Sequence, residues 1–426
     1  MGMNTVNIII FCGLLSISCS AQKVDKQLTY AKKNSKSKVM KLVNGRWFNG
    51  EIFEKKTVWV SEEGLISFKA TDKRTDTIID VSGKYIIPPF AEAHNHNLES
   101  AYGLDKRIAS YLKNGVFYVK HLSSIKKRID PLMHNYNKPS GIDVSLAHAP
   151  LTATGGHPIS LRKRYLEFGY FAGLFNSIEE IEFHGYVRID NKNDLVHKWD
   201  SIMSFSPDFI KINLLHSEEY EQRKDDTLYF GKKGLNPKLV PHIVEKAHAE
   251  GLRVSVHVET AHDFHVAVNA GVDEIAHLPE IKNGKHIHKK DVILAKEKGI
   301  IVVTTVSLVT KKQKSPNYQD LLSNIKFNLK LLKDEGVILA LGSDMYNDNS
   351  SGELQLLYQL GVFSNLELLK MWTENATKTT FPKRKIGKLK EGYEASFLVL
   401  DKNPLDDISK VTEHIVFMIK QGVILK

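Results

Sequence analysis

The chain has 426 residues, of which 42% are hydrophobic and 25% charged, and its formal net charge is +10. This is the composition of an ordinary globular protein, and the length fits two or three domains or one large barrel with an appended domain. The two cysteines, Cys12 and Cys19, lie in the first twenty residues. The rest of the chain therefore has no thiol nucleophile, no disulfide and no cysteine-ligated zinc site.

Residues 1–21 predict an export signal. The stretch "VNIIIFCGLLSIS" (6–18) is apolar but shorter than the roughly 20 residues that span a membrane, and it fits the apolar core of a signal peptide. "LLSISCS" resembles a bacterial lipobox with Cys19 as the lipidated residue, and cleavage after Ala21 is the alternative. We expect an exported protein, either periplasmic or an outer-membrane-associated lipoprotein attached by its N-terminal lipid only. The leader "MGMNT" lacks the usual Lys or Arg, so an N-terminal strand of a cytoplasmic protein is the competing interpretation.

Residues 22–37 are rich in lysine and predict a solvated basic tether. A basic patch for nucleic acid is the alternative. No interleaved aromatic residues and no nucleic-acid motif accompany the charges, so we expect no nucleic-acid partner.

Two strand-rich segments bracket the middle of the chain. Residues 38–87 alternate short β-like runs with the turn signals "NG", "EEG" and "SG". Residues 384–426 show the same pattern in "ASFLVLDKNPLDD" and "IVFMIKQGVILK". We predict that the two segments together form a small β-sandwich.

Residues 88–383 alternate apolar, β-branched runs with helical stretches, a pattern typical of βα units around a parallel sheet. The eight runs begin in the segment before residue 88 and cover 86–94, 116–123, 143–150, 208–215, 252–259, 273–279, 300–307 and 337–344. Helices are expected between them, for example over 237–250, 289–299 and 365–378. Eight units predict an α/β fold with a (β/α)8 TIM barrel. A doubly wound open sheet is the alternative, although the chain has no GxGxxG or Walker A sequence for a nucleotide-binding version.

Polar groups that bind metals recur at the ends of these runs. His94 and His96 alternate on the first run and so point to the same face. The other groups are Lys211, His257, His277 and Asp344 on runs four, five, six and eight. Each has an ordinary structural explanation when taken alone: a hydrogen-bonded core histidine, an ion-paired lysine or a helix-capping aspartate. Because the carboxyl ends of barrel strands meet at one face, the set together indicates a metal site.

The order of these residues resembles the metal-dependent amidohydrolase superfamily over nearly the whole chain that follows the predicted export signal. That family has a small β-sandwich, a strand that leads into His-x-His (here "PPFAEAHNH"), then Lys, His, His and Asp on strands 4, 5, 6 and 8, and a closing segment like "IGKLKEGYEASFLVLDKNPLDDI". The segment "TATGGHP" (152–158) is most similar to the branch that contains prolidase-like and Xaa-Arg dipeptidases and relatives of imidazolonepropionase. The chain departs from the family pattern at Pro89, Glu92 and Ser396.

The resemblance implies one or two divalent metal ions, with zinc favoured over manganese or iron. His94, His96, Lys211 and Asp344 would hold one ion, and Lys211, His257 and His277 the other. Lys211 would be N-carboxylated and bridge both ions; an unmodified Lys211 would indicate a site with one metal. Metal-activated hydroxide would attack the substrate, with Asp344 as the proton shuttle. His157 would contact the substrate, or is an ordinary loop histidine.

The leading hypothesis is thus a metal-dependent amidohydrolase that cleaves a C–N bond in a small amide, a cyclic amide or a dipeptide. A hydrolytic deaminase of the same superfamily with one metal is the second hypothesis, and Glu259, two residues after His257, keeps it open. A non-catalytic exported binding lipoprotein is the third. The sequence leaves the substrate and the oligomeric state undetermined.

Overall fold

The computed structural model describes residues 39–70, 75–279 and 286–425. The predicted export signal and basic tether, with Cys19 and Ala21, lie outside these ranges and stay predictions. Within these ranges, none of the helices has both the length and the apolar character that a membrane span requires.

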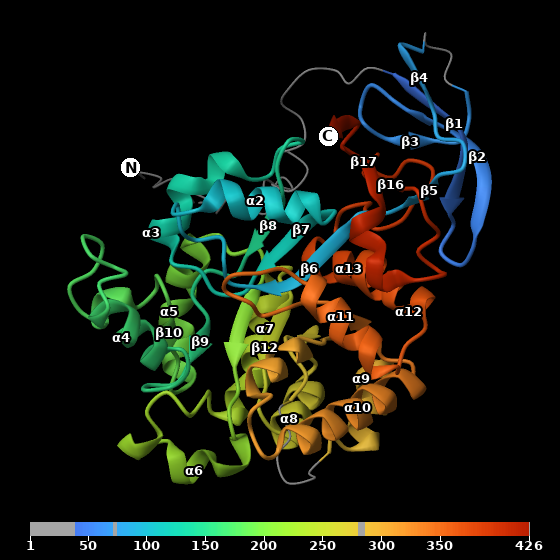
Figure 1. Ribbon diagram of the computed structural model, residues 1–426. Helices are drawn as coiled ribbons and strands as arrows, with labels where there is room; N and C mark the ends of the chain where they lie inside the picture. The colour runs from blue at the N-terminus through green and yellow to red at the C-terminus, as the bar shows by residue number, and fades with distance from the viewer. Residues whose placement is uncertain (1–38, 71–74, 280–285, 426) are drawn as a thin grey trace, which may run out of the picture.

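Segments from both ends of the chain form one eight-stranded sheet, which sits at one side of the molecule (Figure 1). Its strands are β1 (Met40–Phe48), β2 (Phe53–Val60), β3 (Ile66–Ser67), β4 (Thr77–Asp80), β5 (Tyr85–Ile87), β16 (Phe397–Leu400), β17 (Ile415–Lys420) and β18 (Val423–Leu425). The two ends meet where β5 pairs antiparallel with β16, with Ile86 opposite Val399. The domain limits at 38–87 and 384–426 stay a prediction.

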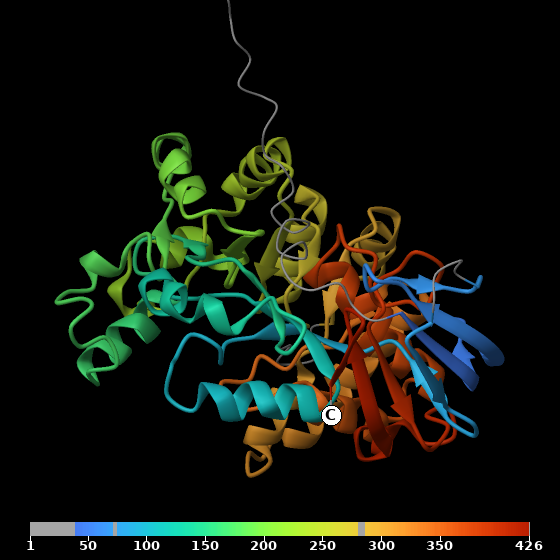
Figure 2. The ribbon, with the colours of Figure 1, turned by 90° about the horizontal axis from the view of Figure 1, so that it is seen from above.

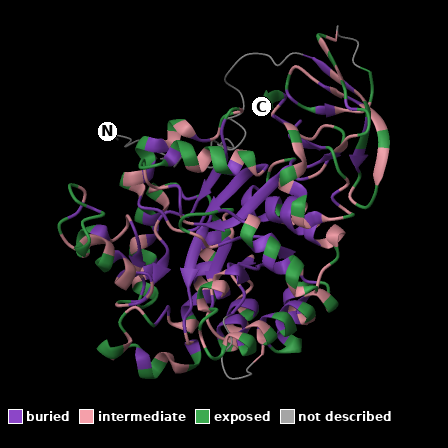
Figure 3. Cartoon of the chain, in the orientation of Figure 1, coloured by how far each residue is buried: buried purple, intermediate pink, exposed green. Residues whose placement is uncertain are grey.

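All eight runs predicted in the middle of the chain contain a strand. These strands are β6 (Phe90–Asn95), β7 (Val116–His121), β8 (Asp143–Leu146), β11 (Ile210–Asn213), β12 (Val254–His257), β13 (Glu274–Ile275), β14 (Ile301–Val303) and β15 (Ile338–Ala340). Two short strands, β9 (Leu151–Thr152) and β10 (Val187–Arg188), join them. Every residue of β7 is buried, as expected for a parallel strand covered on both faces. The strands form the buried centre of the molecule (Figure 3).

Every strand pair among these central strands is parallel, which confirms the predicted mixed α/β class. The closed eight-stranded barrel is not confirmed, because the described strands form two sheets, β6-β7-β8 and β10-β9-β11-β12-β13-β14-β15. Backbone hydrogen bonds connect the edges: Ala93 N–H donates to the Leu341 carbonyl at 3.0 Å, and Asp208 N–H donates to the Leu146 carbonyl at 2.9 Å. We call these two contacts between the sheets the seams. At both seams one partner lies outside a regular strand, so the hydrogen-bond ladder between strands is interrupted there.

Helices surround the central strands, while the eight-stranded sheet lies to one side of them (Figures 1 and 2). The α-helices are α2 (Leu104–Lys113), α3 (Lys126–Ile129), α4 (Ile159–Glu167), α5 (Lys192–Ser204), α6 (Tyr220–Arg223), α7 (Val240–Ala249), α8 (Ala261–Ala270), α9 (Lys289–Glu297), α10 (Tyr318–Asp334), α11 (Ser351–Leu360), α12 (Asn365–Lys370) and α13 (Ala376–Thr380). Shorter turns are the 3-10 helices η2 (Asp130–Asn135), η3 (Glu179–Ile181), η4 (Ser217–Glu219), η5 (Thr227–Tyr229), η6 (Pro237–Leu239), η7 (Val306–Lys312) and η9 (Ile408–His414), and the π-helix η8 (Met371–Asn375).

Local sequence explains where several helices begin and end. Thr260 and Asp263 form a capping box at the start of α8, and Gly271 ends that helix in the left-handed conformation at φ 77°. Ser364 and Glu367 form the same box at the start of α12. The helix predicted over 365–378 is therefore present, but its middle turn is the π-helix η8. Trp372 of η8 stacks on Phe90 of β6 with ring centroids 3.8 Å apart, which packs this turn under the first strand.

A buried ionic cluster joins β17, the last strand but one, to the central strands. Lys420 is fully buried, and its Nζ donates to Asp143 Oδ1 at 2.6 Å and to the carbonyls of Lys138 and Gly141 at 2.7 and 2.8 Å. Arg384 donates to the other oxygen of Asp143 at 2.7 Å. Because the charges are paired and hydrogen-bonded, they are tolerated in the interior, but each depends on its partner.

We predict that Lys420→Met lowers the free energy of unfolding by about 3–5 kcal/mol, because it leaves one oxygen of the buried Asp143 carboxylate and two carbonyls without the Lys420 donor, while Arg384 still pairs with the other oxygen. Chemical denaturation measures the change. Lys402→Met, at an exposed position of the same segment, is the control and should stay within about 0.5 kcal/mol of the unmodified protein. Equal stability of the two variants would contradict this account of the cluster.

Candidate metal centre and active site

The ends of the first and last central strands bring together His94, His96 and Asp344. Asp344 Oδ1 lies 3.3 Å from His94 Nε2 and 3.1 Å from His96 Nε2. One ligand atom from each of the three residues lies within 4.8 Å of the other two. Asp344 has φ 52°, a left-handed conformation that is uncommon for a non-glycine residue. Two predicted histidines and the predicted aspartate are thus placed so that they can share one ion.

Backbone contacts hold these side chains in place. Ser343 N–H and Asp344 N–H donate to the His94 carbonyl at 3.1 and 2.8 Å. Gly342 permits this approach, because a Cβ there would lie 2.7 Å from the His94 nitrogen. The glycine of "LGSD" is therefore required by the contact with the His94 backbone.

The buried Glu92 side chain also connects β6 to the segment that contains Ser343 and Asp344. Its carboxyl group accepts hydrogen bonds from Ser343 N–H at 2.8 Å and from Ser343 Oγ at 3.1 Å. Burial raises the pKa of Glu92 to about 8, although the hydrogen bonds from Ser343 and His94 favour the ionised form. Glu92 is one of the departures from the family pattern, and here it supports the segment that carries Asp344.

The His94 imidazole is oriented by Ala276, the residue that follows β13. Its Nδ1 donates to the Ala276 carbonyl at 2.6 Å, which leaves Nε2 to face Asp344. Burial lowers the pKa of His94, so the ring is neutral near neutral pH. A neutral imidazole whose second nitrogen is held by a carbonyl is a typical metal ligand.

Lys211 on β11 is buried, and its Nζ has no hydrogen-bond partner among the described residues. Burial lowers its pKa to about 7, with a smaller contribution from Lys120, while Glu274 and Asp344 oppose the shift. A buried amine without a partner is energetically costly. The position therefore suits an amine that is either modified or bound to another group.

His257 at the end of β12 and His277 just after β13 complete the predicted set. His277 Nε2 lies 2.6 Å from His257 Nδ1, and His257 Nε2 lies 3.2 Å from Glu259 Oε1. The His94 and His277 ring centroids are 5.8 Å apart. Burial lowers the pKa of both His257 and His277, and neighbouring histidines lower it further.

The six predicted ligands thus gather at the carboxyl ends of strands from both central sheets. Neutral imidazoles, a carboxylate and an unpartnered buried amine fit one or two divalent ions of the zinc type. Their individual roles as ligands stay predictions, as does the identity of the metal.

His157 lies beside this group, on the loop that precedes α4. The His157 ring stacks on His257 with centroids 5.0 Å apart. The backbone N–H of His157 donates to the Lys233 carbonyl at 2.9 Å. A Cβ on the preceding residue, Gly156, would collide with Thr152 Oγ1, so only glycine fits there. Burial lowers the pKa of His157 to about 4, which keeps the ring neutral. The predicted substrate-side position is next to the ligands, and the role itself stays a prediction.

A cavity of about 180 Å³ opens over these groups. Its lining includes His94, His96, His157, Lys211, His257 and Asp344. Other polar residues that were not predicted from the sequence also line it, among them Glu99, Arg162, Lys311 and Tyr346. The Tyr346 ring stacks on His96 with centroids 5.3 Å apart. The cavity therefore has its own polar groups beyond the predicted ligands.

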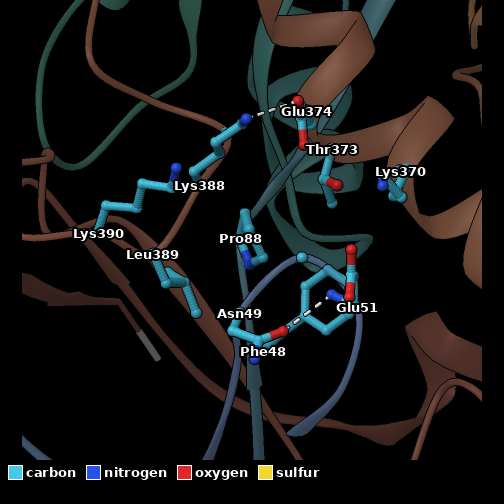
Figure 4. Close-up of a pocket in the computed structure, with 12 residues that line it drawn as sticks. Phe48, Asn49, Glu51, Pro88, Lys370, Thr373, Glu374, Lys388, Leu389 and Lys390 are labelled. Atoms are coloured by element: carbon cyan, nitrogen blue, oxygen red, sulfur yellow. Dashed lines mark hydrogen bonds and ion pairs between the residues drawn. The ribbon is translucent and has the colours of Figure 1, made fainter.

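A second hollow of about 370 Å³ lies elsewhere, against Pro88 just before β6 (Figure 4). Its lining includes Lys370, Lys388 and Lys390, and Lys388 Nζ pairs with Glu374 at 2.7 Å. Because it faces the amino end of β6, it is separate from the metal-ligand cluster at the carboxyl end and contains none of the predicted site residues.

A family model described as "Amidohydrolase family" matches residues 85–426, which is most of the chain. The chain belongs to the amidohydrolase family. This confirms the family predicted from the sequence, and the predicted class, a hydrolase that acts on carbon–nitrogen bonds, agrees with it.

Other members resemble this amidohydrolase over different lengths. Ochratoxinase of Aspergillus niger is 30% identical over 203 residues, which are 45% of this chain and 40% of ochratoxinase. The chain thus matches less than half the length of that relative. The crystal structure of A. niger ochratoxinase covers 92% of this chain and 96% of its own, with a TM-score of 0.71 and 22% identity.

Two further structures share the amidohydrolase fold of this chain. A prolidase complexed with N-methylphosphonate-L-proline matches with a TM-score of 0.70 and 20% identity, covering 91% of this chain and 99% of its own. A Xaa-Pro dipeptidase with bound methionine in its active site matches with a TM-score of 0.68 and 18% identity, covering 91% of this chain and 100% of its own. At these identities the matches show the fold.

We predict that Lys211→Ala loses bound metal and that added bicarbonate does not restore it, because the substitution removes the amine that the buried position presents to the ligand cluster. Elemental analysis of purified protein measures the metal. Lys238→Ala, at an exposed position before α7, is the matched control and should keep the metal content of the unmodified protein. Full metal content in Lys211→Ala would rule out Lys211 as a ligand.

Proposed function

We propose that this protein is a metal-dependent amidohydrolase that cleaves a carbon–nitrogen bond in a small amide, a cyclic amide or a dipeptide. The observation that carries the proposal is the gathering of His94, His96 and Asp344 with the unpartnered Lys211 in one cavity. Family membership supports it, and so do the names of its relatives, which include an ochratoxinase, a prolidase and a Xaa-Pro dipeptidase.

In this proposal His94, His96 and Asp344 would hold one divalent ion, His257 and His277 would hold a second, and Lys211 would serve both. When bound, such ions polarise a carbonyl group and lower the pKa of water. Zinc suits the neutral imidazoles and the carboxylate best.

Lys211 would be shared as a carbamate. The neutral amine attacks the carbon of CO₂, a new N–C bond forms as one C=O π bond breaks, and one proton is released, so that the neutral side chain becomes an anionic carbamate. The burial of Nζ and the absence of a hydrogen-bond partner for it within the described residues support this step. An anion at that place satisfies a position where an ammonium group would be costly.

Asp344 would move the proton during hydrolysis. Its carboxylate lies beside both histidines of the first pair, at the rim of the cavity. It takes a proton from the attacking water and then gives that proton to the leaving nitrogen, so the carboxylate is regenerated in each turnover. Burial opposes ionisation of Asp344, but His94 and His96 lower its pKa and keep it in the carboxylate form.

The proposal also treats the two parallel sheets as one functional (β/α)8 barrel whose active site lies at the carboxyl ends of its strands. The backbone hydrogen bonds at the two seams, Ala93 to Leu341 and Asp208 to Leu146, support this interpretation.

A deaminase with one metal is the second candidate, because Glu259 lies 3.2 Å from His257 and faces the same group of residues. In that case Glu259, not Asp344 alone, would transfer protons. The number of ions needed for full activity distinguishes the two candidates.

We predict that Asp344→Asn keeps much of the bound metal but lowers kcat by about 10²–10⁴-fold, because the amide cannot accept the proton. The measurement is a screen of dipeptides, N-acyl amino acids and cyclic amides, followed by kinetics on the best substrate and elemental analysis of the variant. Asp334→Asn, at an exposed position at the end of α10, should have unchanged kcat. Unchanged turnover in Asp344→Asn would remove Asp344 from the proton-transfer role.

A further inference from the structure

Arg162 is a buried cation in the wall of the proposed active site. It lies on α4, five residues after His157, and only 4% of its surface is exposed. It nevertheless lines the same cavity as His94, Lys211 and Asp344. Its neighbours on the helix, Lys163 and Arg164, are exposed. Of three consecutive basic residues, only Arg162 is thus directed into the site.

The Arg162 guanidinium group is held by hydrogen bonds to the protein, but these bonds do not use all of its N–H donors. Nη2 donates to Ser123 Oγ at 2.5 Å, and Nε donates to the Gly185 carbonyl at 3.4 Å. A guanidinium has five N–H donors, and within the described part of the chain only these two hydrogen bonds form. The guanidinium of this cavity-lining residue therefore has N–H donors left for a ligand.

Glu99 is the nearby carboxylate, but it does not neutralise Arg162 fully. Glu99 Oε1 lies 3.8 Å from Arg162 Nη1, which is longer than the roughly 2.7–2.9 Å of a charge-assisted hydrogen bond. The other oxygen, Oε2, accepts the Ile125 N–H at 2.6 Å. Since the backbone holds Glu99 at this distance, Arg162 can bind a second carboxylate.

The mouth of the cavity adds further positive charge. Lys311 lines the cavity and is exposed, and an outer hollow that shares His157 and Leu161 with the cavity is lined by Lys163, Arg164 and Lys232. Glu167 is the acidic residue in the lining of the outer hollow, 4.0 Å from Lys163. A cleft with an excess of one sign of charge concentrates ligands of the opposite sign. The approach therefore favours an anion.

We propose that Arg162 binds a carboxylate of the substrate, so that this enzyme prefers amides that carry a free carboxylate, such as N-acyl amino acids and dipeptides, over their carboxamides. The inference rests on the proposed hydrolytic function and adds to it a residue that determines specificity. Arginine suits this role because its planar group pairs with both oxygens of a carboxylate. A purely structural role, joining α4 to Ser123 and Gly185, is the alternative to be tested.

The test compares acid and carboxamide forms of the same substrates. Arg162→Gln, Arg162→Lys and the unmodified protein are assayed on the best N-acyl amino acids and dipeptides from a screen, each paired with its C-terminal carboxamide. Arg46→Gln is the matched control, because Arg46 is exposed on β1 of the eight-stranded sheet, where it bonds Tyr85.

We expect the unmodified protein to favour the acid over the carboxamide by about 10–100-fold in kcat/KM, the range given by one hydrogen-bonded charge pair. Arg162→Gln should reduce that ratio to near one, mainly through KM for the acid, while activity on the carboxamide changes less than about threefold. Arg162→Lys should restore part of the preference. A ratio that is the same in both proteins, or equal losses on both substrates, would overturn the proposal and leave Arg162 a structural residue.

Binding separates this inference from the proposed function. If the unmodified protein cleaves no amide, the hydrolytic function fails, and calorimetry with N-acetylglycine and N-acetylglycinamide then decides the role of Arg162. Tighter binding of the acid by about tenfold or more, lost in Arg162→Gln, supports the carboxylate site. Equal affinity for both compounds, or an unchanged preference in the variant, contradicts it.

Discussion

The hydrogen bonds that Ser343 and Asp344 donate to the His94 carbonyl join the first and last central strands, and the candidate site depends on this seam. The contact requires Gly342, because any Cβ would meet the His94 backbone. Glu92 reinforces it from the interior through Ser343. The two segments that carry the predicted ligands His94 and Asp344, about 250 residues apart in the chain, are thereby held within hydrogen-bonding distance.

Beneath the site, the strands carry a second polar layer. Lys120 on β7 donates to Glu274 on β13 at 2.7 Å and to Thr379 at 2.9 Å, and Ser255 donates to the other oxygen of Glu274 at 2.7 Å. These bonds satisfy Glu274, so Lys211 above this layer is left without a hydrogen-bond partner within the described residues. Lys211 Nζ is therefore a buried amine that a ligand or a modification would satisfy.

Much of this arrangement could be predicted from the sequence. The alternation of β-branched runs and helical stretches placed all eight central strands, because buried parallel strands need continuous apolar residues. His94, His96, Lys211, His257, His277 and Asp344 could be grouped because strand ends share one face. Closure of the barrel could not be predicted from the apolar runs, because the seams use irregular backbone at Leu341 and Asp208. Arg162 was also missed: within "LRKR" the three basic residues are alike until the packing of α4 buries one of them.

Elemental analysis of protein purified without added metal or chelator measures whether His94, His96, Lys211, His257, His277 and Asp344 hold divalent metal. We expect close to two ions per chain, retained through gel filtration. A single ion per chain with full activity would favour the mononuclear alternative. Protein that holds no metal, and whose activity does not respond to zinc or to chelator, would rule out the proposed metal centre.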